Sequence, residues 1–248
     1  MKTTFKILSI IGSPHDRNSN TRALIDDFVE ELARQGLELE HELISLGKKE
    51  IKPCRGCWNC TYEKPCPVKD DLPEIKQKMV ECDMLILGSP VYTNQVSAQM
   101  KALFDRLFTW CHIYPLLGKY SLSAVTTGNE GHKETSEFLE KMLATYGTRS
   151  FGSLMSIGAF TPGFFPWRGK ARQKNQKIAR KVARTIMDEK KPASRKIQKQ
   201  IFKVMNNKMN GVHTINCMQH GIPEGQPAPV KLRQKIMSYF FKKLNREK

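Results

Sequence analysis

Short apolar segments alternate with amphipathic segments along the first 190 residues of the chain. Most of the short segments are continuous apolar runs typical of buried strands, and one alternates apolar with polar residues as a strand near a sheet edge does. The predicted strands are residues 5–11, 37–44, 84–87, 122–127 and 151–160. Apolar residues recur at helical spacing in residues 20–32, 72–82, 96–110, 134–146 and 170–191. Strands that alternate with helices predict a parallel sheet covered on both faces.

Three loops that follow the predicted inner strands combine glycine with hydroxyl or amide side chains. They are residues 12–21, 88–94 and 126–131. Each composition is also typical of ordinary turns. Loops at the carboxyl ends of parallel strands, however, form the ligand crevice of open α/β folds. Three such loops after successive inner strands therefore favour one shared ligand.

The first of these loops leads into the N-terminus of the predicted helix 20–32, where unpaired backbone N–H groups and a partial positive charge favour an anion. Donor side chains suited to phosphate surround this helix end, namely Ser13, Arg17, Ser19, Asn20 and Thr21. Helix capping by Ser19 or Asn20 needs no ligand, but this composition exceeds what a cap requires. Neither GxGxxG nor GxxxxGK[ST] occurs, which argues against a dinucleotide-binding fingerprint and a P-loop.

Size and charge set the broad class of protein. A chain of 248 residues can bury a sizeable core in one domain, with an appendage. The net charge of +17 is concentrated in residues 151–248, which hold 22 Lys/Arg against 4 Asp/Glu. This asymmetry favours an acidic partner for the C-terminal part. The N-terminus runs directly into a strand and no apolar run approaches the roughly 20 residues of a membrane span, so we expect a cytoplasmic protein.

Four cysteines lie close together in the predicted loop 47–71. Cys54, Cys57, Cys60 and Cys66 give the spacing C-x2-C-x2-C-x5-C, followed by Pro67. In a reducing compartment, clustered thiols indicate a metal or redox role rather than disulfides. A final Cys-Pro also occurs in ferredoxin-type 4Fe–4S motifs. Zinc accepts four thiolates too, although its structural sites usually use two separated pairs, and free or redox-active thiols are a third possibility.

The remaining cysteines have simpler interpretations. Cys82 and Cys111 fall on predicted helices beside apolar residues and are expected in the core. Cys217 has His213 and His220 nearby, but no fourth ligand is evident, and a polar turn is the simpler interpretation.

Several ordered motifs are similar to those of the NAD(P)H-dependent FMN reductase family of the flavodoxin-like superfamily, and most similar to its iron–sulfur flavoprotein branch. The motifs are Gly12-Ser13-Pro14 with Ser19-Asn20-Thr21, Gly88-Ser89-Pro90-Val91-Tyr92, and Met100-Lys101-Ala102-Leu103-Phe104-Asp105-Arg106-Leu107. The resemblance covers about residues 4–185. It implies a flavodoxin-like, doubly wound, five-stranded α/β sheet of order 2-1-3-4-5, with FMN at the switch point.

The resemblance also implies how FMN is bound. The phosphate would lie on Ser13, Ser19, Asn20 and Thr21. Family members often have an arginine directly after Gly-Ser-Pro, whereas this chain has His15 there and Arg17 two residues later, so both are candidates. The isoalloxazine ring would contact one set of residues on each flank, namely Pro90, Val91, Tyr92 and Asn94, and Thr127 and Gly128. The cysteine spacing resembles the compact cluster motif of iron–sulfur flavoproteins.

The sequence divides into a flavodoxin-like domain, residues 1–191, and a basic helical extension, residues 192–248. Within the extension, residues 196–209 and 230–244 are amphipathic and lysine-rich. These segments can pack on the sheet domain or a second subunit, or contact an anionic membrane peripherally, and no pattern of specific nucleic-acid binding is present. The apolar loop 160–167 predicts at least a homodimer, and similar flavoproteins form dimers or tetramers.

We therefore expect an FMN-dependent oxidoreductase or electron-transfer flavoprotein. NAD(P)H is the expected donor, with ferredoxin as an alternative that the sequence leaves open. A 4Fe–4S cluster on the four cysteines would relay electrons singly. No catalytic side chain is predicted, because the flavin itself supplies the chemistry. The alternatives are an FMN-binding redox-sensing or interaction protein, and a quinone or azo-compound reductase without a cluster.

Overall fold

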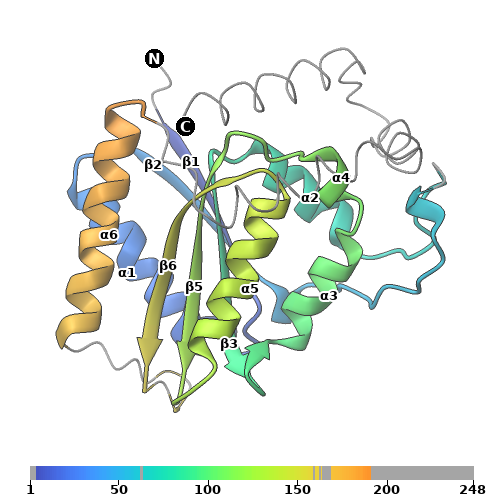
Figure 1. Cartoon of the computed structure of the whole chain (residues 1–248), viewed down its shortest axis with the longest axis horizontal. Coiled ribbons are helices and arrows are strands. Elements are labelled where there is room, and N and C mark those ends of the chain that lie inside the picture. Colours follow the sequence, from blue (N-terminus) through green and yellow to red (C-terminus); the bar gives the residue numbers. More distant parts are fainter. Residues whose placement is uncertain (1–3, 62–63, 159, 162, 164–168, 191–248) are drawn as a thin grey trace, which may run out of the picture.

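A parallel sheet runs through the computed structural model, which describes residues 4–61, 64–158, 160–161, 163 and 169–190 (Figure 1). Its strand order is β2-β1-β3-β5-β6, and each neighbouring pair is parallel. The strands are β1 (Phe5–Ile11), β2 (Leu39–Ser45), β3 (Met84–Tyr92), β5 (Tyr120–Thr127) and β6 (Arg149–Ile157). With the short β4 set aside, this is the predicted flavodoxin-like order, which is confirmed.

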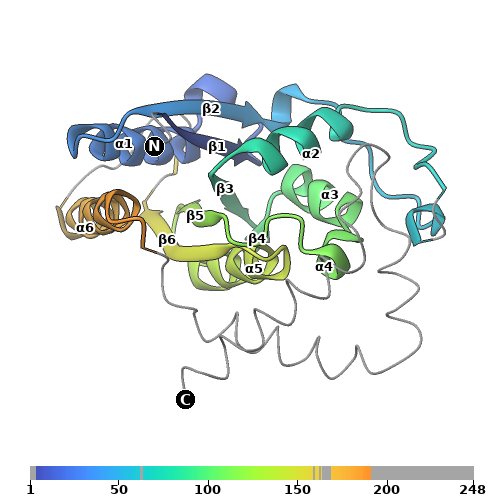
Figure 2. The same ribbon diagram turned by 90° about the horizontal axis from the view of Figure 1, so that it is seen from above.

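Helices cover both faces of the sheet (Figure 2). On one face, α1 (Asn20–Arg34) packs against α6 (Gly169–Met187). The other face carries α2 (Leu72–Glu81), α3 (Ala98–Arg106), α4 (Trp110–Ile113) and α5 (His132–Thr145). Short 3-10 turns lie at η1 (Asp16–Asn18), η2 (Leu46–Lys48) and η3 (Asn59–Thr61). None of the helices in the described ranges combines the length and apolar character needed to cross a membrane.

Strand β1 shows why the inner strands read as continuous apolar runs. Ile7 and Ile11 belong to the core under α1 and α6, whereas Leu8 and Ile10 belong to the core on the opposite face. Successive side chains of a strand point to opposite faces, so a strand covered on both sides is apolar at nearly every position; the buried Ser9 is the exception in the middle of β1. The same division holds for Met84 and its neighbours in β3.

The predicted helix 96–110 is wrong at both ends, because α3 covers only Ala98–Arg106 and a separate turn of helix, α4, begins at Trp110. The chain first turns back on itself, and β4 (Gln95–Val96) pairs antiparallel with the end of β3. Thr93 and Asn94 form the two-residue turn with φ of 48° and 58°, as a type I′ hairpin requires. Helix α3 then begins after Ser97, whose Oγ accepts a hydrogen bond of 3.3 Å from the Met100 N–H.

The helical periodicity was misleading there because Val96 is buried, as a helical residue at that spacing would be. Its burial comes instead from pairing with Val91. Several predicted features lie outside the described residues: the extension 192–248 with its two amphipathic segments, Cys217, and most of the apolar loop 160–167.

Candidate functional site

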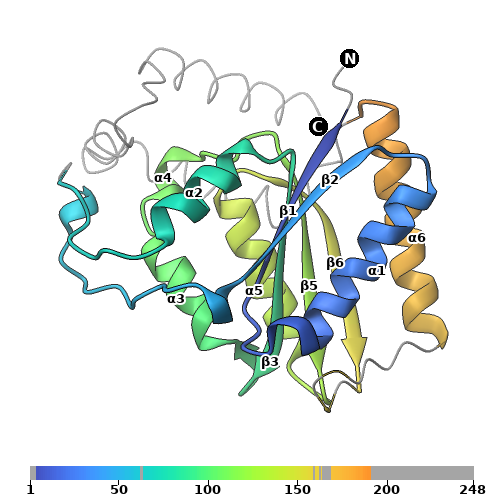
Figure 3. The same cartoon turned by 180° about the vertical axis from the view of Figure 1, so that it is seen from behind.

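Three loops meet at the carboxyl edge of the sheet, which is the lower edge in Figures 1 and 3. The backbone of Gly12 donates a hydrogen bond of 2.8 Å to the Gly88 carbonyl, which joins the first loop to the second. Gly131 has φ of 76°, and a Cβ there would lie 2.8 Å from Asn94 Cα, so the third loop also lies against the second. The three loops that the sequence predicted to share a ligand therefore lie in direct contact.

The first loop places hydroxyl groups at the N-terminus of α1. Ser19 caps the helix, with its Oγ accepting a hydrogen bond of 3.2 Å from the Arg22 N–H. Ser13, Ser19 and Thr21 are each at most 3% exposed. The first-turn amides of such a helix have no acceptor within the helix and can receive phosphate oxygens. The local structure is thus suited to a phosphate group.

Asn20 provides an independent sign of a missing ligand. Its Nδ2 donates a hydrogen bond of 2.8 Å to the Thr161 carbonyl. Its Oδ1 is buried, and no donor in the described part of the chain reaches it. A buried acceptor without a partner is costly, so a ligand hydroxyl or amide would stabilise the site. A flavin mononucleotide, with one phosphate and a polyhydroxyl chain, fits these groups.

The two basic candidates on this loop are less enclosed. His15 and Arg17 are both exposed, at the rim of the crevice. Asp16, which lies between them, pairs instead with Arg22 at 3.3 Å. Of the predicted phosphate-binding side chains, the structure encloses the hydroxyls and Asn20 and leaves His15 and Arg17 at the surface.

The second and third loops present a partly open surface for a flat ring. Pro90 and Val91 are half-buried, whereas Tyr92 and Asn94 are exposed on the β3–β4 hairpin. Thr127 is buried and donates a hydrogen bond of 2.6 Å to the Glu130 carbonyl, which fixes the third loop.

Sequence reasoning overlooked two serines that support the second loop. The Ser89 hydroxyl accepts a hydrogen bond of 3.0 Å from the Ser97 N–H and donates one of 2.8 Å to the Pro90 carbonyl. Gly12 packs so closely on Ser97 and Met100 that a side chain there would collide with both. Ser97 falls inside the predicted helix 96–110, and the preference of serine for the N-cap position is the signal that could have moved the predicted start to residue 98.

Phe160 lies beside the third loop. A Cβ on Gly128 would lie 2.8 Å from the Phe160 ring, which is 76% exposed. An exposed aromatic side chain therefore lies beside Thr127 and Gly128, the predicted flank of the ring site. Phe160 is the first residue of the apolar segment 160–167 noted in the sequence.

The cysteine loop projects from the domain between β2 and α2, beside α3 (Figure 3). Cys54, Cys57, Cys60 and Cys66 are all exposed free thiols. At the base of the loop, the Glu50 N–H donates a hydrogen bond of 2.8 Å to Asp71 Oδ2. The four predicted ligands thus share one loop whose two ends are tied together.

The thiols of this loop influence one another electrostatically. Packing around its sulfur raises the pKa of Cys60, and the charges of Cys54 and Cys66 raise it further. Among the described residues, no three side chains of cysteine, histidine or acid already form a metal-binding set. Four thiols are suitable ligands for a thiolate-bound metal centre, but in this structure their sulfur atoms do not converge on one point.

An aromatic contact joins the cysteine loop to the end of α3. The rings of Trp58 and Phe108 lie 5.8 Å apart at an interplanar angle of 81°, an edge-to-face arrangement. Both side chains are exposed, at 60% and 45%. Trp58 adopts φ of 60°, so the loop turns sharply at this point.

The two other described cysteines differ from each other. Cys82 is buried at the end of α2, as predicted, and its thiol donates a hydrogen bond of 3.3 Å to the Met79 carbonyl. Cys111 is only half-buried, so its expected place in the core is wrong. It lies on the single turn of α4 rather than on a long helix, and its thiol donates to the Phe108 carbonyl at 3.0 Å.

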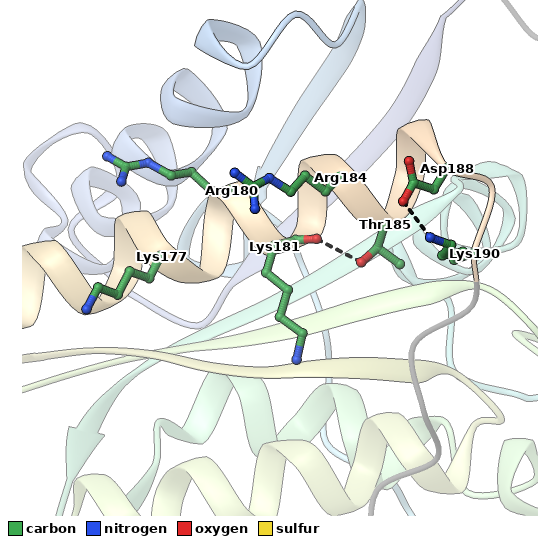
Figure 4. Close-up of a pocket in the computed structure, with 7 residues that line it drawn as sticks. All are labelled: Lys177, Arg180, Lys181, Arg184, Thr185, Asp188 and Lys190. Atoms are coloured by element: carbon green, nitrogen blue, oxygen red, sulfur yellow. Dashed lines mark hydrogen bonds and ion pairs between the residues drawn. The ribbon is translucent and has the colours of Figure 1, made fainter.

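A basic hollow lies elsewhere, along the C-terminal half of α6 (Figure 4). Its lining residues are Lys177, Arg180, Lys181, Arg184, Thr185, Asp188 and Lys190. Helix α6 starts after the carboxyl end of β6, so its last turns lie away from the crevice (Figure 1). The basic residues that line this hollow are therefore separate from the candidate flavin site.

The sheet order, the helix end suited to phosphate and the open ring surface define a flavodoxin-like flavin-binding protein. The sequence profile of the NADPH-dependent FMN reductase family matches residues 5–161. The chain belongs to this family, and it is an FMN-dependent oxidoreductase.

Individual relatives carry more specific names. An iron–sulfur flavoprotein of Archaeoglobus fulgidus is 31% identical over 205 residues, which cover 82% of this chain and 91% of the relative. An iron–sulfur flavoprotein of Methanosarcina thermophila is 31% identical over 159 residues, 63% of this chain and 82% of the relative.

Solved structures share the fold. The apo form of an NADH:FMN oxidoreductase has a TM-score of 0.54 at 18% identity, covering 73% of this chain and 89% of the other. An NAD(P)H:quinone oxidoreductase from Methanothermobacter marburgensis has a TM-score of 0.52 at 19% identity, covering 74% and 96%.

Proposed function

We propose that this protein is an NAD(P)H-dependent FMN oxidoreductase whose cysteine loop carries a 4Fe–4S cluster. The observation that carries the proposal is the presence of four exposed thiols on one tied loop in a chain of the FMN reductase family. The names of the two iron–sulfur flavoproteins support it.

The residues of the chain have distinct tasks in this scheme. Ser13, Ser19 and the first-turn amides of α1 would bind the phosphate, and Asn20 Oδ1 would accept a hydrogen bond from the ligand. The exposed Tyr92 leaves one side of the ring surface open to a donor or acceptor. When bound, FMN supplies hydride and single-electron transfer and a 4Fe–4S cluster supplies single-electron transfer, so the protein needs to position them rather than provide an acid or base.

The four thiolates would hold the cluster. Exposure of the thiols leaves room for iron and sulfide to enter. In the described residues 54–61 and 64–66 the loop is irregular apart from the 3-10 turn Asn59–Thr61, so it can adjust around them. Zinc binding would use the same thiolates and would leave a quinone or azo-compound reductase without a relay.

The absorbance spectrum and metal content of protein purified without oxygen test the proposal. Flavin bands with an added broad shoulder near ~400 nm, together with about four iron and four sulfide per FMN, are expected. Flavin bands without iron or sulfide would contradict the cluster, and stoichiometric zinc would favour the cluster-free reductase. Rapid reduction of the bound flavin by NADH or NADPH is expected as well, and its absence would favour a redox-sensing or interaction protein.

A further inference from the structure

A buried ion pair lies at the base of the cysteine loop. Arg106, the last residue of α3, contacts Asp70 through both of its terminal nitrogens, at 2.5 and 3.3 Å. The two side chains are only 3% and 0% exposed. Burial by itself raises the pKa of Asp70, but hydrogen bonds from Arg106 and from backbone amides lower the pKa overall. Both groups are therefore charged, which requires each of them to be well partnered.

The pair binds both ends of the loop. Asp70 accepts hydrogen bonds of 3.0 Å from the Lys52 N–H and 3.2 Å from the Leu72 N–H. Arg106 also donates to the Lys52 carbonyl at 3.0 Å. Residues 52 and 70 flank the four cysteines, so one guanidinium–carboxylate pair fixes the point where the loop leaves the domain and the point where it returns.

Arg106 also contacts one of the four thiols. Its Nη2 donates to Cys66 Sγ at 3.6 Å. The ammonium of Lys76 interacts electrostatically with Cys60 and Cys66 from α2. Two basic side chains, Arg106 and Lys76, therefore lie on the side of the loop that faces the domain, which suits sulfur ligands that carry negative charge.

Helix α3 connects this contact to the flavin crevice. Its first turn is capped by Ser97, which packs on Gly12 of the phosphate loop, and its last residue is Arg106. A helix is stiff over such a short length, so its two ends keep a fixed separation. The cysteine loop is thereby held in a defined place relative to the crevice.

We propose that Arg106 is a positioning residue for the iron–sulfur centre: it ties the cysteine loop to α3 and donates a hydrogen bond to the sulfur of the fourth ligand, Cys66. This inference rests on the proposed function. Hydrogen bonds and positive charge at ligand sulfurs favour the reduced, more negative form of a cluster and so raise its reduction potential. Arg106 is thus expected to set how readily the centre accepts an electron.

The test uses the full chain with Arg106→Met, Arg106→Lys and Asp70→Asn, and Lys101→Met as control. Lys101 is exposed on the same helix and pairs with Asp105 at the surface. Iron and sulfide per FMN and the cluster midpoint potential are measured without oxygen. Hydrogen exchange of the peptides that contain Lys52 and Leu72 is measured on iron-free protein.

Arg106→Met should lower the cluster potential and speed exchange of both peptides about tenfold, because the amides lose an ordered partner. Arg106→Lys, which keeps the charge but loses the two-pronged contact, should give a smaller change, and Lys101→Met none. Wild-type potential and exchange in Arg106→Met would overturn the inference. If that variant does not fold, Arg106→Lys and Asp70→Asn decide, and wild-type values in both overturn it.

Failure of the proposed function looks different. Wild-type protein without iron after anaerobic reconstitution would refute the cluster and with it the role of Arg106 toward Cys66. Wild-type protein with a full cluster, but with unchanged potential and exchange in the variants, would refute the role of Arg106 alone.

Discussion

The hydroxyls of Thr21 and Thr126 lie 2.7 Å apart, although the two residues are 105 positions apart in the chain. Thr21 lies on the first turn of α1 and Thr126 near the end of β5, and both are buried. A Cβ on Gly88 would lie 2.8 Å from the Thr21 methyl group, so β3 also reaches this point. The helix end that would receive phosphate is therefore anchored to two strands by the protein's own contacts.

The bound flavin is expected to be FMN rather than FAD. The helix end suited to phosphate follows the first loop, and the sequence has no adenosine-binding fingerprint. Mass spectrometry of the released cofactor checks this. Recovery of FAD, or of no flavin after reconstitution, would contradict the prediction.

Removing two hydroxyls from the first loop should weaken FMN binding. Ser13→Ala with Thr21→Ala is expected to cost roughly 1–3 kcal/mol, through hydrogen bonds to a charged group and loss of the contact with Thr126. Flavin fluorescence quenching gives the Kd. Thr185→Ala is the matched control, since its hydroxyl bonds to the Lys181 carbonyl on α6. An unchanged Kd in the double variant would place the phosphate elsewhere.

Serine at any one of the four loop cysteines should remove most of the iron and sulfide and leave FMN bound. The two sites lie on different strand-to-helix connections, β2–α2 and β1–α1. Reduction of two-electron quinones should then persist, while transfer to one-electron acceptors falls. Cys82→Ser is the control and should keep its iron, because that thiol is buried at the end of α2. Full iron content in all four loop variants would exclude these ligands.

Alkaline pH should reduce folding stability through Cys82. Burial raises the pKa of this thiol to about 11, whereas the unfolded chain titrates it near ~8.5. Below both values the thiol is protonated in both states, and above pH ~8.5 the unfolded chain loses its proton first, so the free energy of unfolding falls until the folded thiol also ionises. At pH 10 the loss should be about 1–2 kcal/mol.

Urea unfolding at pH 8 and pH 10, with a reductant present, measures this effect. Cys82→Val keeps a similar volume without an ionisable group, so its stability should fall less between the two pH values. Other titrating groups are common to both proteins and cancel in the comparison. Equal losses in the two proteins would show that Cys82 does not contribute.

The protein is expected to form at least a homodimer. Phe160 and Tyr92 expose aromatic rings at the same edge of the sheet, and a second subunit could cover them. Light scattering at micromolar concentration measures the mass. Polar substitution of Phe160 should weaken the association without changing the far-UV spectrum, and a monomeric wild type would refute the expectation.

The sheet and the crevice loops could be predicted because a strand buried on both faces, such as β3, leaves a continuous apolar run followed by glycine. The hairpin at Thr93 and Asn94 could not, because its positive φ angles occur in residues other than glycine and leave no distinctive pattern. The four cysteines were evident from their spacing alone. The pairing of Asp70 with Arg106 joins residues 36 apart and is set by tertiary packing, which periodicity does not report.

Trp58 gives the cysteine loop an optical signal of its own. It is 60% exposed, whereas Trp110 is 4% exposed, so these two indoles should emit at different wavelengths. The chain has a third tryptophan, Trp167, so the difference between wild type and Trp58→Phe isolates the emission of Trp58. The more exposed Trp58 should emit at the longer wavelength. A change in loop conformation, or an iron–sulfur cluster that absorbs its emission, should alter this long-wavelength emission first. Trp58, which contacts Phe108, can therefore report on the loop through the fluorescence difference between wild type and Trp58→Phe.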